Sequence, residues 1–247
     1  MKAKILCVYD EGSVPGTSLI GAKGISMLVE ADGRKVLFDT GRRGEYLLHN
    51  LSFLDVKSED VDTVVISQAG KDHSGGLKDL LKEREGTVDI YAPASIWGEK
   101  KLFGSSGAHI PADLEGKAAK HDVDRWTQIS EHIFLSEPIG GETVLVIRTR
   151  KGPAVLSGRS VGGVRNIIAA VNDELGEKPK TYIGGVNIAK KESAKADDIA
   201  EAFRGSGCSS LYLNHCTGIE GMMYLRTNLG LKGVNDFYAG SVLELDL

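Results

Sequence analysis

The stretch VVISQAGKDHSGGL, residues 64–77, decides the fold. It opens as a nearly continuous apolar run, which is typical of a strand buried on both faces. It closes on an Asp–His pair, a serine and two glycines ahead of a helical pattern. If positions 68 and 70 extend the strand, histidines there would share one metal, and Asp72 with His73 in the following turn would suit a second. This chain instead has Gln68 and Gly70.

The rest of the chain predicts hairpins first and then strands that alternate with helices. Asp32 and Gly33 suit the two positive-φ positions of a type I′ turn between two β-rich runs. Later strands alternate with helical patterns over 162–175, 193–205 and 219–230. This mix favours two β-sheets, or one large mixed sheet, with helices outside. Residues 104–130 hold glycine, proline and isolated charges and give no clear prediction.

Composition places the chain among ordinary globular proteins. Its 247 residues are 41% hydrophobic and 26% charged, which suits a single domain over 1–247. The net charge of −4 argues against nucleic acid or an anionic membrane as partner. No apolar run reaches the length of a membrane span, and the N-terminus has no signal-peptide pattern. Three cysteines without CxxC spacing suit a reducing cytoplasm.

Polar side chains collect where the predicted strands end. Asp39, Gln68 to His73, Arg159, Asn187 and His215 all stand at such positions. Sites are commonly built on loops at strand ends, because the sheet holds them rigid while the loops are free to vary. The five positions together therefore predict a functional site.

Several short motifs, in their order along the chain, resemble the metallo-β-lactamase fold. They are FDTG, LLHN, DHSGGL, IGGVN and NHCTG. The resemblance runs from about residue 5 to the end and is poorest over 90–145. Within the family, the motifs resemble most the branch that includes archaeal enzymes of the 7,8-dihydropterin-6-methyl ribofuranosylaminobenzene phosphate synthase type. It implies an α/β (α+β) fold, a four-layer αββα sandwich, with a metal site at the edge where the two sheets meet.

The chain departs from this family at most of the expected histidines. The first motif pair is replaced by Gln68 and Gly70, and a Gly-His-Gly reads Ala-Lys23-Gly. The strand-end motif over 158–161 has Arg159 and no histidine, and the GG-x-His motif ends in Asn187. By resemblance, the first two motif histidines and a later histidine serve the first of two metal sites, so that site has lost all its imidazoles.

The second metal site keeps Asp72, His73 and His215. We therefore expect at most one divalent metal there, zinc first, with iron and manganese as alternatives, and Asp72 as the catalytic residue. The competing interpretation is that Asp72 only caps the following helix and that both histidines are hydrogen-bonded relics.

A side-chain cation could also replace the missing metal. Lys71 and Arg159 lie in loops that should converge on the first site, and Arg159 could give the buried Asp72 a bidentate partner. The competing interpretation is that both cations point into water.

Five side chains are predicted to bind the substrate, an anionic or pterin-like small molecule: Lys23, Gln68, Lys71, Arg159 and Asn187. Two classes of function are left open. One is a metal-dependent, hydrolase-like enzyme with an atypical centre, and the other is a non-catalytic ligand-binding member of the superfamily without metal.

Overall fold

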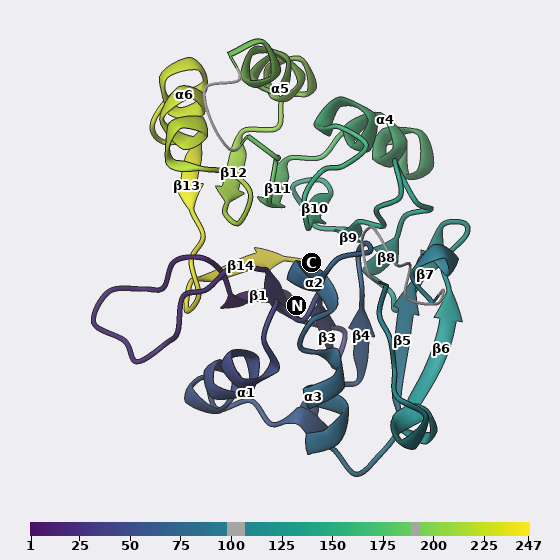
Figure 1. Ribbon diagram of the computed structural model, residues 1–247. Helices are drawn as coiled ribbons and strands as arrows, with labels where there is room; N and C mark the ends of the chain where they lie inside the picture. The colour runs from purple at the N-terminus through teal and green to yellow at the C-terminus, as the bar shows by residue number, and fades with distance from the viewer. Residues whose placement is uncertain (98–106, 189–192) are drawn as a thin grey trace. The chain divides into compact units, whose positions relative to one another are not determined.

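The computed structural model describes residues 1–97, 107–188 and 193–247. The chain divides into two compact units. Unit 1 comprises Met1–Asp124 and Tyr238–Leu245, and unit 2 comprises Arg125–Phe237 and Asp246–Leu247. Each unit has its own seven-stranded sheet and its own hydrophobic core (Figure 1).

The sheet of unit 1 has the strand order β14-β1-β2-β3-β4-β5-β6. Strands β1 to β3 run antiparallel to their neighbours, and β3 to β6 run parallel. The strands are β1 Lys2–Tyr9, β2 Ser26–Ala31, β3 Arg34–Phe38, β4 Thr63–Val65, β5 Val88–Ala92, β6 Ala118–Asp122 and β14 Val242–Asp246. The helices are α1 Gly44–Phe53, α2 Lys71–Ser74 and α3 Leu77–Glu83, with short 3₁₀ turns at Ser58–Asp60, Ala94–Ile96 and Ala112–Lys117.

The predicted hairpin between β2 and β3 is confirmed. Ala31 pairs with Arg34, so the loop has two residues. Asp32 and Gly33 have φ angles of 55° and 74°, the positive values that a type I′ turn needs at both positions.

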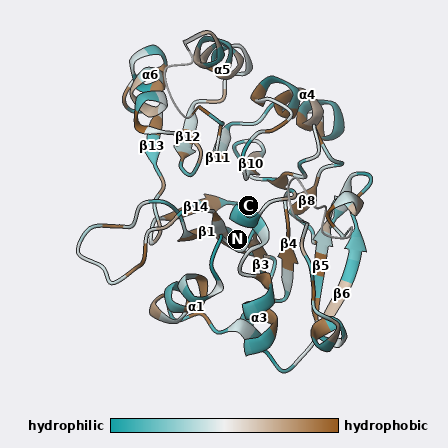
Figure 2. Ribbon diagram, viewed as in Figure 1, coloured by the Kyte–Doolittle hydropathy of each residue, from teal (hydrophilic) through white to brown (hydrophobic). Residues whose placement is uncertain are grey.

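Helices α1 and α3 pack on one face of the unit-1 sheet (Figure 1). They bury Leu47, Leu51, Leu77 and Leu80 against the strands, and each such side chain contributes about 1.5–3 kcal/mol by leaving water. In Figure 2, β4 is brown along its length whereas the helices carry both colours. This is the difference expected between a strand buried on both faces and an amphipathic helix.

The sheet of unit 2 has the strand order β13-β12-β11-β10-β9-β8-β7. Strands β10 to β13 run parallel, and β7 to β10 run antiparallel to their neighbours. The strands are β7 Thr127–Gln128, β8 Ile133–Leu135, β9 Leu145–Ile147, β10 Ala154–Ser157, β11 Thr181–Gly184, β12 Ser210–Leu213 and β13 Val234–Asp236. Helices α4 Val164–Leu175, α5 Ser193–Ser206 and α6 Ile219–Leu229 lie side by side over this sheet (Figure 1).

The structure differs from the sequence prediction at the end of β4 and supplies a strand, β6, where sequence alone allowed no clear prediction. Strand β4 ends at Val65 and the chain bends over 68–70, so positions 68 and 70 do not extend the strand. Gly70 has φ and ψ of 144°, a conformation essentially restricted to glycine. The segment without a clear prediction contains β6, whose residues are all at least partly exposed and therefore form no apolar run. None of the helices in the described ranges is long and apolar enough to cross a membrane.

Candidate functional site

The carboxyl ends of β3 and β4 meet at one edge of the unit-1 sheet, because these strands are parallel neighbours. Asp39 follows β3 directly, and Ser67, Gln68 and His73 follow β4. The four side chains are buried, with exposed fractions of 0%, 0%, 8% and 2% in that order. We call these four residues the histidine cluster.

Hydrogen bonds link every member of the histidine cluster. The Asp39 carboxylate accepts from the Ser67 backbone N–H and hydroxyl, each at 2.7 Å, and its Oδ2 lies 2.7 Å from His73 Nδ1. On the other side of the ring, Gln68 Nε2 lies 3.1 Å from His73 Nε2. The backbone carbonyl of His73 also accepts from the N–H and hydroxyl of Thr40, at 2.7 and 3.0 Å. Both ring nitrogens of His73 and its backbone carbonyl therefore take part in hydrogen bonds.

Asp72 lies in α2, beside the histidine cluster, and has a cationic partner that sequence analysis did not single out. Its Oδ1 lies 2.8 Å from Arg42 Nη1, and its Oδ2 lies 3.9 Å from Lys23 Nζ. The helix caps preceding α2 and α3 are Gly70 and Gly76. The interpretation of Asp72 as a helix cap is therefore wrong, because the carboxylate bonds to a guanidinium and not to a backbone N–H.

Gly75 and Gly76 lie so close to the loop between β3 and α1 that neither position has room for a Cβ. A Cβ on Gly75 would lie 2.2 Å from the carbonyl oxygen of Arg42, and one on Gly76 would lie 2.3 Å from that of Thr40. Both distances are far inside contact range, so only glycine lets the junction between α2 and α3 lie against the β3–α1 loop. This packing brings Arg42 to Asp72.

Lys23 and Lys71, two of the predicted substrate-binding residues, are exposed. The segment that carries Lys23 is tied to α1 by Asn50, whose buried amide bonds to Val8 and to both backbone groups of Ile20 at 2.8–3.0 Å. This asparagine is the last residue of the LLHN motif, and the motif alone does not indicate this role.

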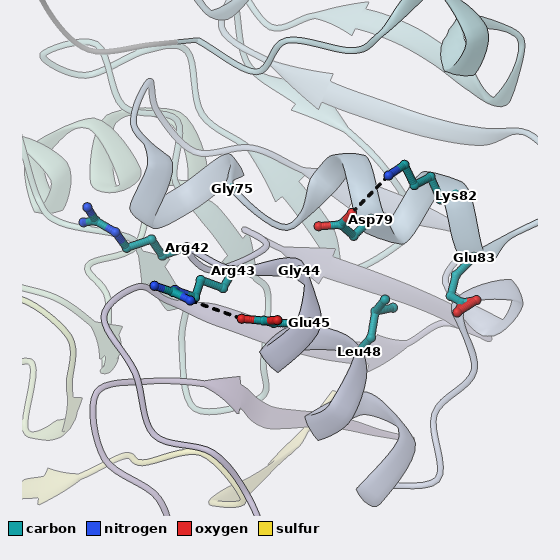
Figure 3. Close-up of a pocket in the computed structure, with 9 residues that line it drawn as sticks. All are labelled: Arg42, Arg43, Gly44, Glu45, Leu48, Gly75, Asp79, Lys82 and Glu83. Carbon is teal, nitrogen blue, oxygen red and sulfur yellow. Dashed lines mark hydrogen bonds and ion pairs between the residues drawn. The ribbon is translucent and has the colours of Figure 1, made fainter.

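A hollow of about 600 Å³ lies between α1 and α3 (Figure 3). Its charged groups already neutralise one another in part: Arg43 pairs with Glu45 at 3.2 Å and Lys82 with Asp79 at 3.7 Å. A hollow with paired charges of both signs does not select an anion. Its lining residues are Arg42, Arg43, Gly44, Glu45, Leu48, Gly75, Asp79, Lys82 and Glu83.

In unit 2, the carboxyl ends of β10, β11 and β12 meet at one edge, because the three strands are parallel neighbours. A non-glycine residue with a left-handed backbone follows each strand: Ser160, Asn187 and His215, with φ of 56°, 56° and 53°. Asp39 in unit 1 has the same feature, with φ of 61°. Such positions cost about 1–3 kcal/mol and cluster at functional sites.

Arg159 and Asn187 approach each other across two of these loops. Arg159 Nε donates to Asn187 Oδ1 at 3.4 Å. The guanidinium is exposed, and no described residue of unit 2 accepts a hydrogen bond from its two terminal nitrogens. An exposed guanidinium with both terminal nitrogens available is suited to bind a carboxylate or a phosphate.

The segment 158–161, which we call the arginine loop, is anchored from below by a fully buried carboxylate. Glu142 accepts from the backbone N–H groups of Arg159 and Val161, at 3.1 and 2.8 Å, and from the Ser157 hydroxyl at 2.7 Å. Glu142 could not be predicted from sequence, because nothing in the local pattern distinguishes it from a surface glutamate.

Cys216 lies beneath the turn that carries Asn187. Its Sγ accepts from the Asn187 N–H at 3.1 Å, and a Cβ on Gly185 would lie 2.5 Å from that sulfur. Burial raises the pKa of the Cys216 thiol to about 12. The thiol is therefore protonated at neutral pH and supports the turn; it is not an activated nucleophile.

The predicted metal ligands are divided between the two units. His215 is buried in unit 2, whereas Asp72 and His73 belong to unit 1. In the arrangement seen, the two unit-1 groups do not fit a metal ion. His73 Nε2 faces the Gln68 amide, and the Asp72 carboxylate is paired with Arg42.

Comparisons with known proteins agree with this fold. The curated relative 7,8-dihydropterin-6-methyl-4-(beta-D-ribofuranosyl)-aminobenzene-5′-phosphate synthase of Methanocaldococcus jannaschii is 24% identical over 80% of this chain and 81% of its own. A solved metal-dependent hydrolase of the β-lactamase superfamily superposes with a TM-score of 0.82 at 25% identity, over 99% of this chain and 100% of the other. The metallo-β-lactamase fold protein YhfI from Bacillus subtilis gives 0.66 at 16% identity, over 99% and 100%.

The predicted fold class, an α/β protein with two mixed sheets, is thereby confirmed. The sequence model of the metallo-β-lactamase superfamily matches residues 23–159, more than half of the chain. The chain belongs to the metallo-β-lactamase superfamily.

Proposed function

We propose that this chain binds a small anionic molecule, pterin-like or phosphorylated, at its strand-end loops and does so without a metal ion at His73. The observation that carries the proposal is the exposed guanidinium of Arg159. Asn187 orients it through Nε, at 3.4 Å, and the loop beneath it is fixed by Glu142. Asn187 is the second predicted donor in unit 2. Of the predicted donors of unit 1, Lys23 and Lys71 are exposed, whereas Gln68 is buried and bonded to His73.

The rigid base of the arginine loop supports a binding role. An oriented guanidinium loses little freedom on binding, so more of its hydrogen-bond energy appears as affinity. The name of the Methanocaldococcus jannaschii relative contains a dihydropterin and a phosphate. That name motivates pterin-like and phosphorylated compounds as the first ligands to try.

The test is isothermal titration with inorganic phosphate and with pterin-6-carboxylate, on chelator-treated protein. We expect saturable binding that Arg159→Ala weakens by about tenfold or more, since a charge-assisted hydrogen bond contributes about 1.5–3 kcal/mol. Arg148→Ala is the matched control, because Arg148 is an exposed arginine of unit 2 that follows β9, at the opposite end of the sheet. Equal losses in both variants, or binding that needs added metal, would contradict the proposal.

A second candidate function is a hydrolase-like enzyme with one metal at Asp72, His73 and His215. The contact between Asp39 and His73 favours it, because metal-binding histidines commonly donate their second ring N–H to a carboxylate. Zinc, or iron or manganese in its place, would supply an acidified water for hydrolysis, with Asp72 as the catalytic residue. This candidate requires Gln68 and Arg42 to turn away from the two ligands.

The second candidate is tested by metal analysis of protein purified without added metal. A stoichiometry near one that falls in both His73→Ala and His215→Ala would support it. A metal-free protein that takes up no zinc, manganese or iron would exclude it and leave the binding function as the explanation of the site.

A further inference from the structure

We propose that Gln68 is a built-in substitute for a metal ion on His73. Its side-chain amide donates a hydrogen bond to His73 Nε2 and takes up the lone pair that a divalent cation would use. Gln68 thereby keeps the histidine cluster ordered and metal-free. This inference concerns unit 1 alone and rests on the metal-free part of the proposed function, whereas anion binding at Arg159 is tested separately and can fail without it.

The direction of the hydrogen bonds around His73 carries the proposal. Both oxygens of Asp39 accept from Ser67, through its N–H and its hydroxyl. His73 Nδ1 lies 2.7 Å from Oδ2, which already accepts from the Ser67 hydroxyl, so we assign the ring N–H as the donor in this contact. A neutral imidazole with a proton on Nδ1 has an unprotonated Nε2, and the group that faces it has to be a donor. The amide NH₂ of Gln68 meets this requirement at 3.1 Å.

Because His73 and Gln68 are buried, the loss of the hydrogen bond at His73 Nε2 would cost stability. His73 is 2% exposed and Gln68 is 8% exposed. A buried nitrogen lone pair without a donor is costly, so something must occupy Nε2 in the folded protein. In a metal-binding histidine that partner is the cation, oriented by a carboxylate on the other ring nitrogen. Here the carboxylate is retained as Asp39, and an uncharged amide stands on the other side.

The carboxylate next to His73 in the sequence also has a side-chain partner. Asp72, the other predicted ligand of unit 1, has its negative charge balanced by Arg42 at 2.8 Å. The imidazole thus has a neutral donor and the carboxylate has a cation. Each of the two predicted ligands of unit 1 thus has a side-chain partner in the place of a metal ion.

The first experiment compares zinc binding by the full chain and by Gln68→Ala, with isothermal titration and with cobalt absorption as a second readout. We expect no His73-dependent zinc binding in the parent. In the variant we expect zinc to bind about tenfold tighter or more, because the competing hydrogen bond is gone. Gln128→Ala, which removes an exposed amide in β7, is the matched control and should behave as the parent.

Two further variants define the site. Gln68→Ala with His73→Ala should lose the gained zinc binding, and Gln68→Ala with Arg42→Ala should bind tighter than Gln68→Ala alone, because Asp72 is then released as well. No gain in Gln68→Ala, or a gain that survives loss of His73, would overturn the proposal. Zinc binding at His73 in the parent would overturn it too.

A measurement on the parent protein avoids any folding defect of the variants. In ¹⁵N NMR spectra of labelled protein at neutral pH, His73 should show a protonated Nδ1 and an unprotonated Nε2, assigned by the signals that His73→Ala removes. The spectrum should not change when zinc is added. The opposite tautomer, or a doubly protonated ring, would mean that Gln68 presents its carbonyl oxygen, and the proposal would be wrong.

Discussion

The histidine cluster of unit 1 and the arginine loop of unit 2 stand at equivalent places, the carboxyl ends of parallel strands, yet they are built in opposite ways. The histidine cluster is buried and its polar groups bond to one another. The arginine loop is anchored by a buried carboxylate but directs its guanidinium outward. The difference indicates that hydrogen bonds join the side chains of unit 1 to one another at this edge, whereas in unit 2 they fix a loop whose guanidinium is exposed.

The largest effect is expected from Asp39→Ala, which breaks the histidine cluster. It leaves the Ser67 N–H, the Ser67 hydroxyl and His73 Nδ1 without their acceptor, so about 3–5 kcal/mol of unfolding free energy should be lost in urea denaturation. Asp55→Ala is the control, because Asp55 has a similar φ of 57° but is exposed. A loss of equal size in both variants would mean that backbone strain, and not the cluster, sets the cost.

Glu142→Ala should lower the unfolding free energy somewhat less, by about 2–4 kcal/mol. It also removes three hydrogen bonds, but the loop is then exposed to water that can replace them. Unlike Asp39→Ala, it should also weaken phosphate binding, since Arg159 loses its fixed base. Glu142→Gln keeps one acceptor oxygen and should recover part of both losses. Unchanged phosphate affinity in Glu142→Ala would show that the anchor does not serve the guanidinium.

Gly70→Ala tests whether the bend before α2 depends on glycine. A side chain at φ and ψ of 144° is strained, so we expect a loss of about 1–3 kcal/mol in the same denaturation assay. Gly86→Ala is the control, because a Cβ at Gly86 meets no atom within 4 Å and its φ is outside the positive range. A neutral Gly70→Ala would show that the bend adapts to a side chain.

Alkaline pH should weaken unit 2 through Cys216. Its pKa is raised by burial from 9.0 to about 12 in the folded chain, so the unfolded chain loses the thiol proton first as pH rises. Stability from this group is complete below pH 9 and decreases as pH rises towards 12, on the order of 1 kcal/mol between pH 9 and 10. Urea denaturation at pH 8 and pH 10 measures the loss, and Cys216→Ala should lose less than the parent does.

The smallest effect is expected from Arg42→Ala. Arg42 is 44% exposed and Asp72 is 16% exposed, so solvent screens their ion pair and the change should cost about 1 kcal/mol or less. A loss of several kcal/mol for Arg42→Ala would place this pair among the interactions that hold the unit together.

Local sequence patterns were sufficient for much of the fold. The I′ hairpin at Asp32 and Gly33 and the amphipathic helix α1 depend on neighbours in the chain, so periodicity and residue type could predict them. The position of Asp72 could be placed beside the strand end in the same way.

The partners of these residues could not be predicted from sequence. Arg42 reaches Asp72 across 30 residues, and Glu142 reaches Arg159 across 17. Gln68 and Gly70 were expected to lie on an extended strand, but the bend at Gly70 turns Gln68 onto His73. A short-range pattern contains no information about which distant backbone group a long polar side chain will meet.

The sequence by itself determined the superfamily resemblance, the strand ends at which polar residues gather and the loss of the expected histidines. Only the tertiary structure decided what those residues do, because a hydrogen bond depends on distance and direction between atoms far apart in the chain. It turned Gln68 from a missing ligand into the donor on His73, and Arg42 from an unremarked loop residue into the cation on Asp72.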